Sequence, residues 1–151
     1  MITYLKGDAT QPQGPEGLKI IAHVCNDQGG FGKGFVLALS RRWPEPEAEY
    51  RKWAKQDSFK LGAVQYVRVA PDLYVANMIA QEGYGGDGKP PIRYPALRQC
   101  LASLERQASR HKASVHMPRI GCGLAGGSWD EVEKLIQEKL GNLQVFVYDL
   151  A

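Results

Sequence analysis

This chain of 151 residues is poor in the features that mark several classes of protein. It has three cysteines, Cys25, Cys100 and Cys122, which lie far apart and form no Cys-x-x-Cys pair. Such spacing argues against a disulfide framework or a zinc site and favours a reducing compartment, so a cytoplasmic location is expected. The sequence also has no apolar run long enough to span a bilayer and no signal-peptide pattern at its N-terminus.

An excess of charge of one sign is lacking as well. With 19 basic and 16 acidic side chains the formal net charge is +3, and the basic residues are scattered. A mild positive charge helps to attract an anionic ligand, but this pattern does not indicate a nucleic-acid partner. No repeat or linker divides the sequence, and no group of metal ligands stands out. We therefore expect one domain over residues 1–151, a monomer with no metal, no other cofactor and no membrane partner.

Short apolar runs alternate with helical patterns along the chain. Strands are predicted at residues 2–5, 19–25, 64–69, 73–80, 114–117 and 143–148. Helices are predicted at residues 35–43, 47–55 and 95–111, and after Ser128, with Pro44 and Pro46 between the first two. This order predicts an α/β fold, a three-layer α/β/α sandwich with a central mixed sheet of about six strands.

The most informative segment is MPRIGCGLAGG at residues 117–127. A strand-like run ends in a loop with four glycines among seven residues, and Ser128 and Glu131 have the spacing of a capping box. Glycines let backbone N–H groups approach a phosphate closely, and the start of a helix adds partial positive charge. The segment therefore predicts a site for a phosphorylated small molecule.

A second glycine-rich loop, residues 27–34, also follows a predicted strand. Ligands of open α/β sheets bind outside the carboxyl ends of the strands, where both loops are expected. Two phosphate-compatible loops on one rim would suit a diphosphate.

Two familiar phosphate motifs fit this chain less well. Gly121, Gly123 and Gly126 match the spacing of the dinucleotide fingerprint, and Asp149 could imitate its ribose-binding acid. That fingerprint opens a Rossmann domain, however, and several further strands must follow it, whereas one is predicted here. The P-loop pattern fails because Gly34 stands where serine or threonine is required.

Three segments, taken in order, resemble the macrodomain family of ADP-ribose-binding modules. They are GDAT at residues 7–10, AHVCN at residues 22–26 leading into GGFGKG at residues 29–34, and PRIGCGL at residues 118–124. The likeness covers essentially the whole chain. Within the family, the AHVCN and PRIGCGL segments most resemble the branch that contains terminal ADP-ribose protein glycohydrolase and the macrodomain antitoxins of DNA-modifying toxins.

The resemblance implies a role for each loop. The Asp8 carboxylate would accept a hydrogen bond from the exocyclic amine of adenine. Ala9 would lie beside the adenine ring, and Tyr148 would border it. The glycine loop would cradle the diphosphate, and the first loop would pack on the distal ribose. The implied ligand-binding residues are Asp8, Ala9, Gly30, Gly32, Lys33, Gly34, Arg119, Ile120, Gly121, Cys122, Gly123, Leu124, Ala125, Gly126 and Tyr148.

Several of these residue types also have ordinary structural explanations. An aspartate such as Asp8 is common in turns because it bonds its own backbone. His23 and His116 lie in apolar strands, where histidines are more often satisfied core residues than catalysts. We interpret Cys25 and Cys122 as packing residues rather than nucleophiles, because nothing in the sequence indicates a lowered thiol pKa.

The chain departs from the glycohydrolase branch at two points. That enzyme attacks the ribose with a lysine placed just after the strand that corresponds to residues 75–80, where this chain has Gln81; Lys89 lies eight residues further on. The enzyme also has an aspartate directly after its GCGL motif, where this chain has Ala125. The resemblance therefore does not imply a lysine adduct here.

Our working hypothesis is hydrolysis of mono-ADP-ribose from acidic side chains of modified proteins, without a covalent enzyme intermediate. Asn26 would hold the distal ribose, Asp27 would act as base, and Gln81 would position water or ribose, since positioning alone lowers barriers substantially. Two alternatives stay open. One is a non-catalytic reader of ADP-ribose or mono-ADP-ribosylated protein, and the other is a phosphatase that acts on ADP-ribose 1″-phosphate, as some relatives do.

Overall fold

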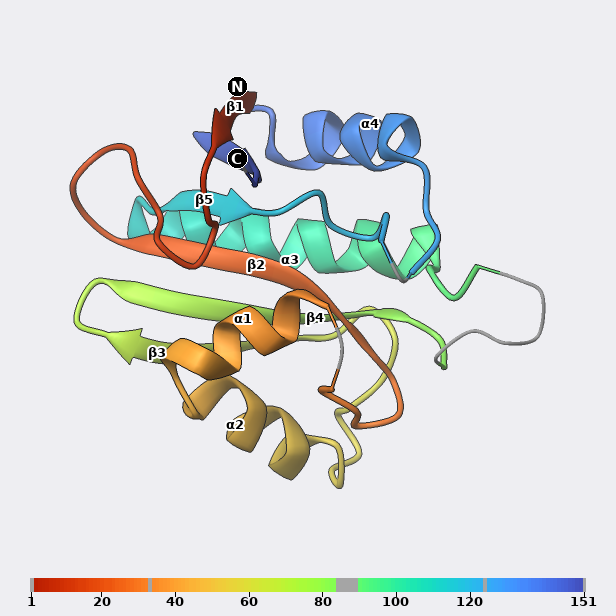
Figure 1. Cartoon of the computed structure of the whole chain (residues 1–151). Helices are drawn as coiled ribbons and strands as arrows, with labels where there is room; N and C mark the ends of the chain where they lie inside the picture. The colour runs from red at the N-terminus through yellow and green to blue at the C-terminus, as the bar shows by residue number, and fades with distance from the viewer. Residues whose placement is uncertain (1, 33, 84–89, 124, 151) are drawn as a thin grey trace.

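In the computed structural model, which describes residues 2–32, 34–83, 90–123 and 125–150, a six-stranded sheet lies between two layers of helices (Figure 1). The strands are β1 Ile2–Lys6, β2 Lys19–Asn26, β3 Val64–Ala70, β4 Leu73–Gln81, β5 Ser114–Met117 and β6 Val145–Asp149. The helices are α1 Phe35–Arg42, α2 Glu45–Trp53, α3 Tyr94–His111 and α4 Trp129–Leu140. The predicted three-layer α/β/α fold is confirmed.

The strand order is β1-β6-β5-β2-β4-β3. Strand β2 lies in the middle and pairs in parallel with β4 on one side and β5 on the other. At one edge β1 pairs in parallel with β6, and at the other edge β3 runs antiparallel to β4. The parallel strands therefore end at one rim, on the right in Figure 1, where residues 27–34 and 118–127 emerge.

Alternation of side chains along β2 divides the apolar core between the two faces of the sheet. Ile20 and Ala22 pack with the layer of α3 and α4, whereas Ile21 and Cys25 pack with the layer of α1 and α2. Each fully buried aliphatic side chain contributes about 1.5–3 kcal/mol relative to exposure. The largest buried residues of the helices over the first face are Leu97, Leu101, Leu104, Ile136 and Leu140.

Two local expectations about helix starts need correction. Helix α4 begins directly after Ser128, as predicted, but the Ser128 side chain makes no capping hydrogen bond. The Ser128 backbone N–H, which the Glu131 side chain would accept in a capping box, donates instead to the Tyr94 hydroxyl at 3.0 Å. Helix α2 begins at Glu45, with Pro46 in its first turn rather than in the preceding break. Proline is tolerated there because first-turn N–H groups have no partner within the helix.

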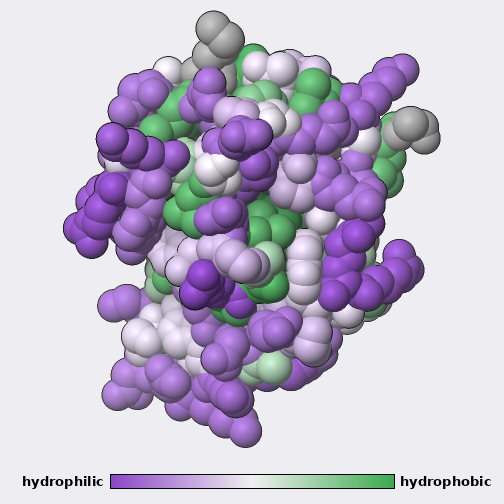
Figure 2. Space-filling model, turned by 90° about the vertical axis from the view of Figure 1, so that its left-hand side faces the viewer, coloured by the Kyte–Doolittle hydropathy of each residue, from purple (hydrophilic) through white to green (hydrophobic). Residues whose placement is uncertain are grey.

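The opposite rim, where β2 and β4 begin, faces the viewer in Figure 2. Hydrophilic side chains cover most of this face and surround scattered apolar areas. No helix in the described part of the chain is both long enough and apolar enough to cross a bilayer.

The burial pattern predicts a large difference between two leucines. Leu104 in α3 has no exposed surface, whereas Leu37 in α1 is 41% exposed. We expect Leu104→Ala to lower the free energy of unfolding by about 2–5 kcal/mol, because the substitution leaves a cavity in the core. Leu37→Ala should cost less than about 1 kcal/mol. Urea denaturation of both variants checks this, and similar losses would contradict the assignment of Leu104 to the core.

Candidate functional site

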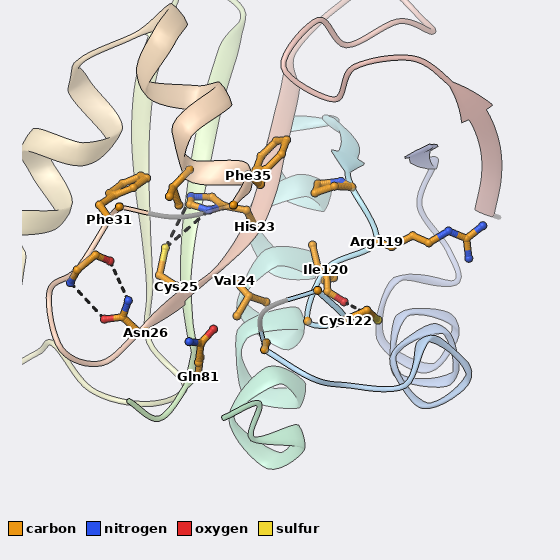
Figure 3. Close-up of a pocket in the computed structure, with 18 of the residues that line it drawn as sticks. His23, Val24, Cys25, Asn26, Phe31, Phe35, Gln81, Arg119, Ile120 and Cys122 are labelled. Atoms are coloured by element: carbon orange, nitrogen blue, oxygen red, sulfur yellow. Dashed lines mark hydrogen bonds between the residues drawn. The ribbon is translucent and has the colours of Figure 1, made fainter. Parts of the chain in front are cut away.

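A cavity of about 670 Å³ opens at the rim where the parallel strands end. Its size lies within the range of roughly 300–1,000 Å³ that is typical of small-molecule sites. The end of β2 and the described residues of the first loop (27–32 and 34) form one wall, and the described residues of the glycine loop (118–123 and 125–127) form the other. Figure 3 shows Asn26 and Phe31 on the first side and Ile120 and Cys122 on the second.

Most residues predicted for the site line this cavity. Those in its lining are Asn26, Gly30, Gly32, Gly34, Gln81, Arg119, Ile120, Gly121, Cys122, Gly123 and Ala125. Those predicted for the site but absent from its lining are Asp8, Ala9, Asp27, Gly126 and Tyr148. Lys33, Leu124 and Lys89 lie outside the described residues.

Asn26 shapes the first loop from within. Its Oδ1 accepts the backbone N–H groups of Gln28 at 2.8 Å and Gly30 at 3.2 Å, and its Nδ2 donates to the Gly30 carbonyl at 2.8 Å. The Tyr50 hydroxyl, beneath the loop, donates to the Asn26 carbonyl at 2.5 Å. The Asn26 amide therefore holds the loop that forms one wall of the cavity.

Asp27 ties the first loop to the end of β4. Its carboxylate Oδ1 accepts the Gly83 N–H at 2.8 Å and the Gln28 side-chain amide at 3.0 Å, and its own N–H donates to the Gln81 carbonyl at 2.9 Å. Gln81 Nε2 donates to the Gly83 carbonyl at 3.0 Å. Gln81 thus belongs to the cavity wall, whereas Asp27 fastens the segment beside it.

The glycine loop closes on itself. The Gly127 N–H donates to the Gly121 carbonyl at 2.7 Å, and the Gly126 N–H donates to the Gly123 carbonyl at 3.1 Å. Gly121 has a φ of +74°, in the left-handed region that favours glycine. Among the described residues, the N–H groups of Cys122 and Gly123 have no hydrogen-bond acceptor, and both residues line the cavity. Unpaired backbone N–H groups of this kind can hold an anion.

Arg119 lies at the edge of the glycine loop, and its charge is already paired. Its guanidinium donates to both Asp149 carboxylate oxygens, at 2.7 and 3.0 Å. It also lies 5.2 Å from the centre of the Tyr4 ring and 5.1 Å from that of Trp129. In Figure 3 the side chain points away from the other labelled residues. The predicted contact between Arg119 and the ligand would therefore have to come from its backbone.

His23 lines the cavity wall although it is only 2% exposed. Its Nε2 lies 2.5 Å from Asn77 Oδ1. Since Asn77 Nδ2 donates to Gln65 Oε1 and to the Pro46 carbonyl, Oδ1 is the acceptor and His23 carries its proton on Nε2. Burial lowers the pKa of His23 to about 4, against the effect of the Asn77 bond, so the imidazole is neutral at neutral pH.

The thiols of the cavity are not activated. Cys25 Sγ lies 3.8 Å from His23 Nδ1, but burial raises the pKa of this thiol well above its ordinary value. Burial also raises the pKa of Cys122, although Arg119 opposes the shift. Thiols rather than thiolates therefore line the cavity at neutral pH, which agrees with their interpretation as packing residues.

The cavity wall also contains residues that were not predicted as site residues, among them Phe31, Phe35 and Arg51. Phe31 and Phe35 lie on either side of the His23 ring, with ring centres 5.8 and 5.9 Å away. Their positions next to the glycines of the first loop could have indicated from the sequence that they line the site. Arg51 donates to the Gly29 carbonyl at 3.0 Å, but its spacing from Glu47 in α2 has the appearance of an ordinary surface ion pair.

No cluster of three or more His, Cys, Asp or Glu side chains that could hold a metal ion occurs within the described ranges. The arrangement is instead that of an organic-ligand site, with backbone N–H groups on one wall and amide and aromatic side chains on the other.

Comparison with solved structures identifies the family. A protein of unknown function from Bacteroides thetaiotaomicron is 57% identical, covers 99% of this chain and 98% of its own, and has a TM-score of 0.95. A macrodomain protein from Streptomyces coelicolor is 50% identical over 99% of both chains, with a TM-score of 0.87. This chain belongs to the macrodomain family. No protein-family model matches it.

The names of three curated relatives indicate three different functions. Chromodomain-helicase-DNA-binding protein 1-like of Danio rerio is 33% identical over 96% of this chain, which spans only 15% of that protein's length. ADP-ribose 1″-phosphate phosphatase of Candida albicans is 28% identical over 98% of this chain and 99% of its own. DNA ADP-ribosyl glycohydrolase of Thermus aquaticus is 23% identical over 99% of this chain and 41% of its own.

Two glycines of the glycine loop should respond differently to substitution. A Cβ on Gly127 would collide with the Gly121 carbonyl oxygen, whereas a Cβ on Gly123 would meet nothing within 4 Å. We expect Gly127→Ala to lower the free energy of unfolding by about 1–3 kcal/mol because backbone must shift, and Gly123→Ala to change it by less than about 0.5 kcal/mol. Thermal denaturation compares the two, and equal midpoints would contradict the closed loop.

The buried histidines predict a loss of stability in mild acid. Burial lowers the pKa of both His23 and His116 from 6.5 to about 4, with Lys19 adding to the shift of His116. Between these values the unfolded chain binds more protons than the folded chain, so the free energy of unfolding falls as pH falls from 6.5 to 4. Each histidine can contribute up to about 3 kcal/mol to this fall.

Denaturant titrations at a series of pH values measure the slope. The variant His116→Gln removes one of the two groups, so its stability should fall less steeply than that of the wild type over the same interval. The difference between the two curves removes the contribution of carboxylates, which titrate in both proteins. Parallel curves would contradict the shift of His116.

Proposed function

We propose that the cavity binds ADP-ribose, with the diphosphate against the glycine loop and the distal ribose against the first loop. The observation that carries this proposal is the pairing of two glycine-rich loops around one cavity, with the N–H groups of Cys122 and Gly123 unpaired among the described residues. Backbone N–H groups suit a diphosphate because they add positive dipoles without the flexibility of a charged side chain. A macrodomain from Trypanosoma brucei with this fold, at 20% identity and a TM-score of 0.63, was solved in complex with ADP-ribose.

In this proposal adenine lies beyond the edge of the cavity, next to Asp8. The Gly7 N–H donates to the Asp149 carbonyl at 2.8 Å, and the Asp149 carboxylate pairs with Arg119, so these residues adjoin the rim. Burial opposes ionisation of Asp8, but hydrogen bonds from Thr10 and the nearby Arg42 charge bring the pKa of its carboxyl below the usual value. A charged carboxylate at this point supports recognition of an amine-bearing purine.

For chemistry, we propose hydrolysis of mono-ADP-ribose esters on acidic side chains. A water oxygen bonds to C1″ of the distal ribose, the bond from C1″ to the ester oxygen breaks, and the electron pair leaves with the carboxylate. Gln81 lies in the cavity wall and would orient the water, while Asn26 holds the loop against the ribose. Asp27 would take the water's proton through a second water, since its carboxylate lies outside the cavity lining. The carboxylate leaving group needs little help from an acid.

A second candidate is removal of phosphate from ADP-ribose 1″-phosphate. The Candida albicans phosphatase, which this chain matches over nearly the full length of both proteins, favours it. Both reactions act at the 1″ position of the same ribose; one releases the carboxylate of a protein side chain and the other releases phosphate. A reader function would need binding alone.

The test joins binding and turnover. Calorimetry with ADP-ribose should show binding to the wild type. Mass spectrometry should then show time-dependent release of ADP-ribose from a protein modified on glutamate. We expect Asn26→Ala to slow release by at least about 100-fold and Gln81→Ala by about tenfold, because both change the position of ribose or water. Binding without release would favour the reader, and phosphate release from ADP-ribose 1″-phosphate the second candidate.

Asp27 has a matched pair of variants. Asp27→Asn keeps an oxygen that can accept the Gly83 N–H but removes the base, whereas Asp27→Ala removes both. If Asp27 is the base, both variants should lose release. Full activity of Asp27→Asn together with loss in Asp27→Ala would reject the base and leave Asp27 as the residue that fastens the loop.

A further inference from the structure

A chain of hydrogen bonds runs from the buried strand β5 to the loop that follows β1 (residues 7–14). His116 has no exposed surface, and its Nε2 lies 2.8 Å from Ser114 Oγ. Its Nδ1 lies 2.8 Å from the Tyr148 hydroxyl. The same hydroxyl lies 2.8 Å from the backbone N of Gln13. These bonds link the interior of the sheet to Gln13, near the far end of the loop.

The direction of each bond follows from the donors available. The Gln13 N–H can only donate, so the Tyr148 oxygen accepts from it. We assign the Tyr148 proton to His116 Nδ1, because the opposite direction would leave that proton without an acceptor among the described residues. His116 must then carry its proton on Nε2, from which it donates to Ser114. A neutral imidazole in this one tautomer is required, and burial favours the neutral form by lowering the pKa of His116.

The aromatic rings beneath the loop support the same arrangement. Phe146 stacks on His116 with ring centres 5.0 Å apart and an interplanar angle of 10°. A Cβ on Gly14 would lie 3.1 Å from the Phe146 ring, and a Cβ on Gly7 would lie 3.7 Å from Tyr148 Cδ2. Both ends of the loop therefore rest directly on side chains of β6, and a change in these rings would move the loop.

Asp8 lies within this loop and depends on its shape. The Asp8 carboxylate accepts the Thr10 N–H at 2.9 Å and the Thr10 hydroxyl at 2.8 Å, which orients it relative to its own backbone. The direction in which it points in the molecule is set by where the loop is fastened and by Arg42 of α1, whose guanidinium donates to the Thr10 hydroxyl at 2.7 Å and lies 3.7 Å from the Asp8 carboxylate. The Gln13 bond to Tyr148 fastens the far side of the loop from Gly7, whose N–H is held by Asp149.

We propose that His116 is a positioning residue for base recognition: through the Tyr148 hydroxyl its imidazole holds residues 7–14 in the conformation that presents Asp8 to the amine of a purine. The inference rests on the proposed ADP-ribose site. It assigns a role in specificity to a histidine that touches neither the cavity nor the ligand. Loss of the imidazole would impair the distinction between adenine and a purine with a carbonyl in place of the amine.

The experiment measures the affinities of ADP-ribose and of its hypoxanthine analogue, inosine diphosphate ribose, by calorimetry. The wild type should prefer ADP-ribose by at least about tenfold, because a carboxylate accepts from an amine but repels a carbonyl oxygen. His116→Phe keeps an aromatic ring on Phe146 and removes both hydrogen bonds. We expect it to lose most of this preference, chiefly through weaker binding of ADP-ribose.

Two further variants separate positioning from folding. Tyr148→Phe deletes one oxygen and should lose the preference to the same extent, and the double variant should lose no more than either single one. His116→Gln offers an oxygen to Tyr148 and an N–H to Ser114, and should restore the preference. Ile136→Val, in the core of α4, serves as a control that lowers stability but leaves the preference unchanged.

The outcomes distinguish this inference from the proposed function. Failure of the wild type to bind either compound would reject the ADP-ribose site itself. Binding with a clear preference that persists in both His116→Phe and Tyr148→Phe would reject the role of His116 and leave the site intact. If His116→Phe does not fold, Tyr148→Phe decides alone, because it keeps the ring packing and removes only the two hydrogen bonds of the hydroxyl, with Gln13 and His116.

Discussion

Parallel pairing of β2 with both β4 and β5 is the constraint on which the rest of the structure depends. Because these strands end at the same rim, the residues that follow them meet there, although they are distant in sequence. Asn26, Gln81 and Pro118 therefore surround one cavity. The antiparallel strand β3 lies at the edge of the sheet and contributes no residue to that lining within the described ranges. The direction of the strands therefore determines where the site lies, and the side chains then determine its chemistry.

Most polar groups of the described side chains at this rim are hydrogen-bonded or ion-paired within the protein itself. The Asn26 amide shapes the first loop, the Asp27 carboxylate fastens residue 83, and the Arg119 guanidinium pairs with Asp149. What remains for a ligand is mainly backbone N–H groups and Gln81. Such a site needs little rearrangement to bind, because its dipoles are already fixed. Among the described residues it also holds few groups that could act as a strong acid or nucleophile, since the Cys25 and Cys122 thiols are protonated and His23 is neutral.

Much of the fold followed from the sequence, because alternation of apolar runs and helical patterns reports burial directly. The glycine loop could also be predicted from the sequence, because its backbone geometry requires glycine. Gly121 has a left-handed φ, and a Cβ on Gly127 would collide with the Gly121 carbonyl oxygen. Contacts between distant elements were not visible. Nothing local shows that Arg119 pairs with Asp149 across the sheet, or that Arg51 of α2 reaches the cavity. The capping box at Ser128 was misjudged because Tyr94, from another helix, satisfies the same N–H group.

The polar residues of β5 and β6 have an explanation in what covers them. Helices α1 and α2 cover the part of one sheet face formed by β2 and β4, and that part is apolar except for His23 and Asn77, which are hydrogen-bonded to each other. The β1 loop, residues 7–14, packs instead on Phe146 and Tyr148. A helix satisfies its own backbone, so apolar side chains beneath it suffice, whereas a loop brings N–H groups that need partners. Tyr148 provides such a partner, and its own hydroxyl in turn requires an acceptor, which His116 supplies. In β5 the buried imidazole of His116 thus serves the hydroxyl that fastens the loop carrying Asp8.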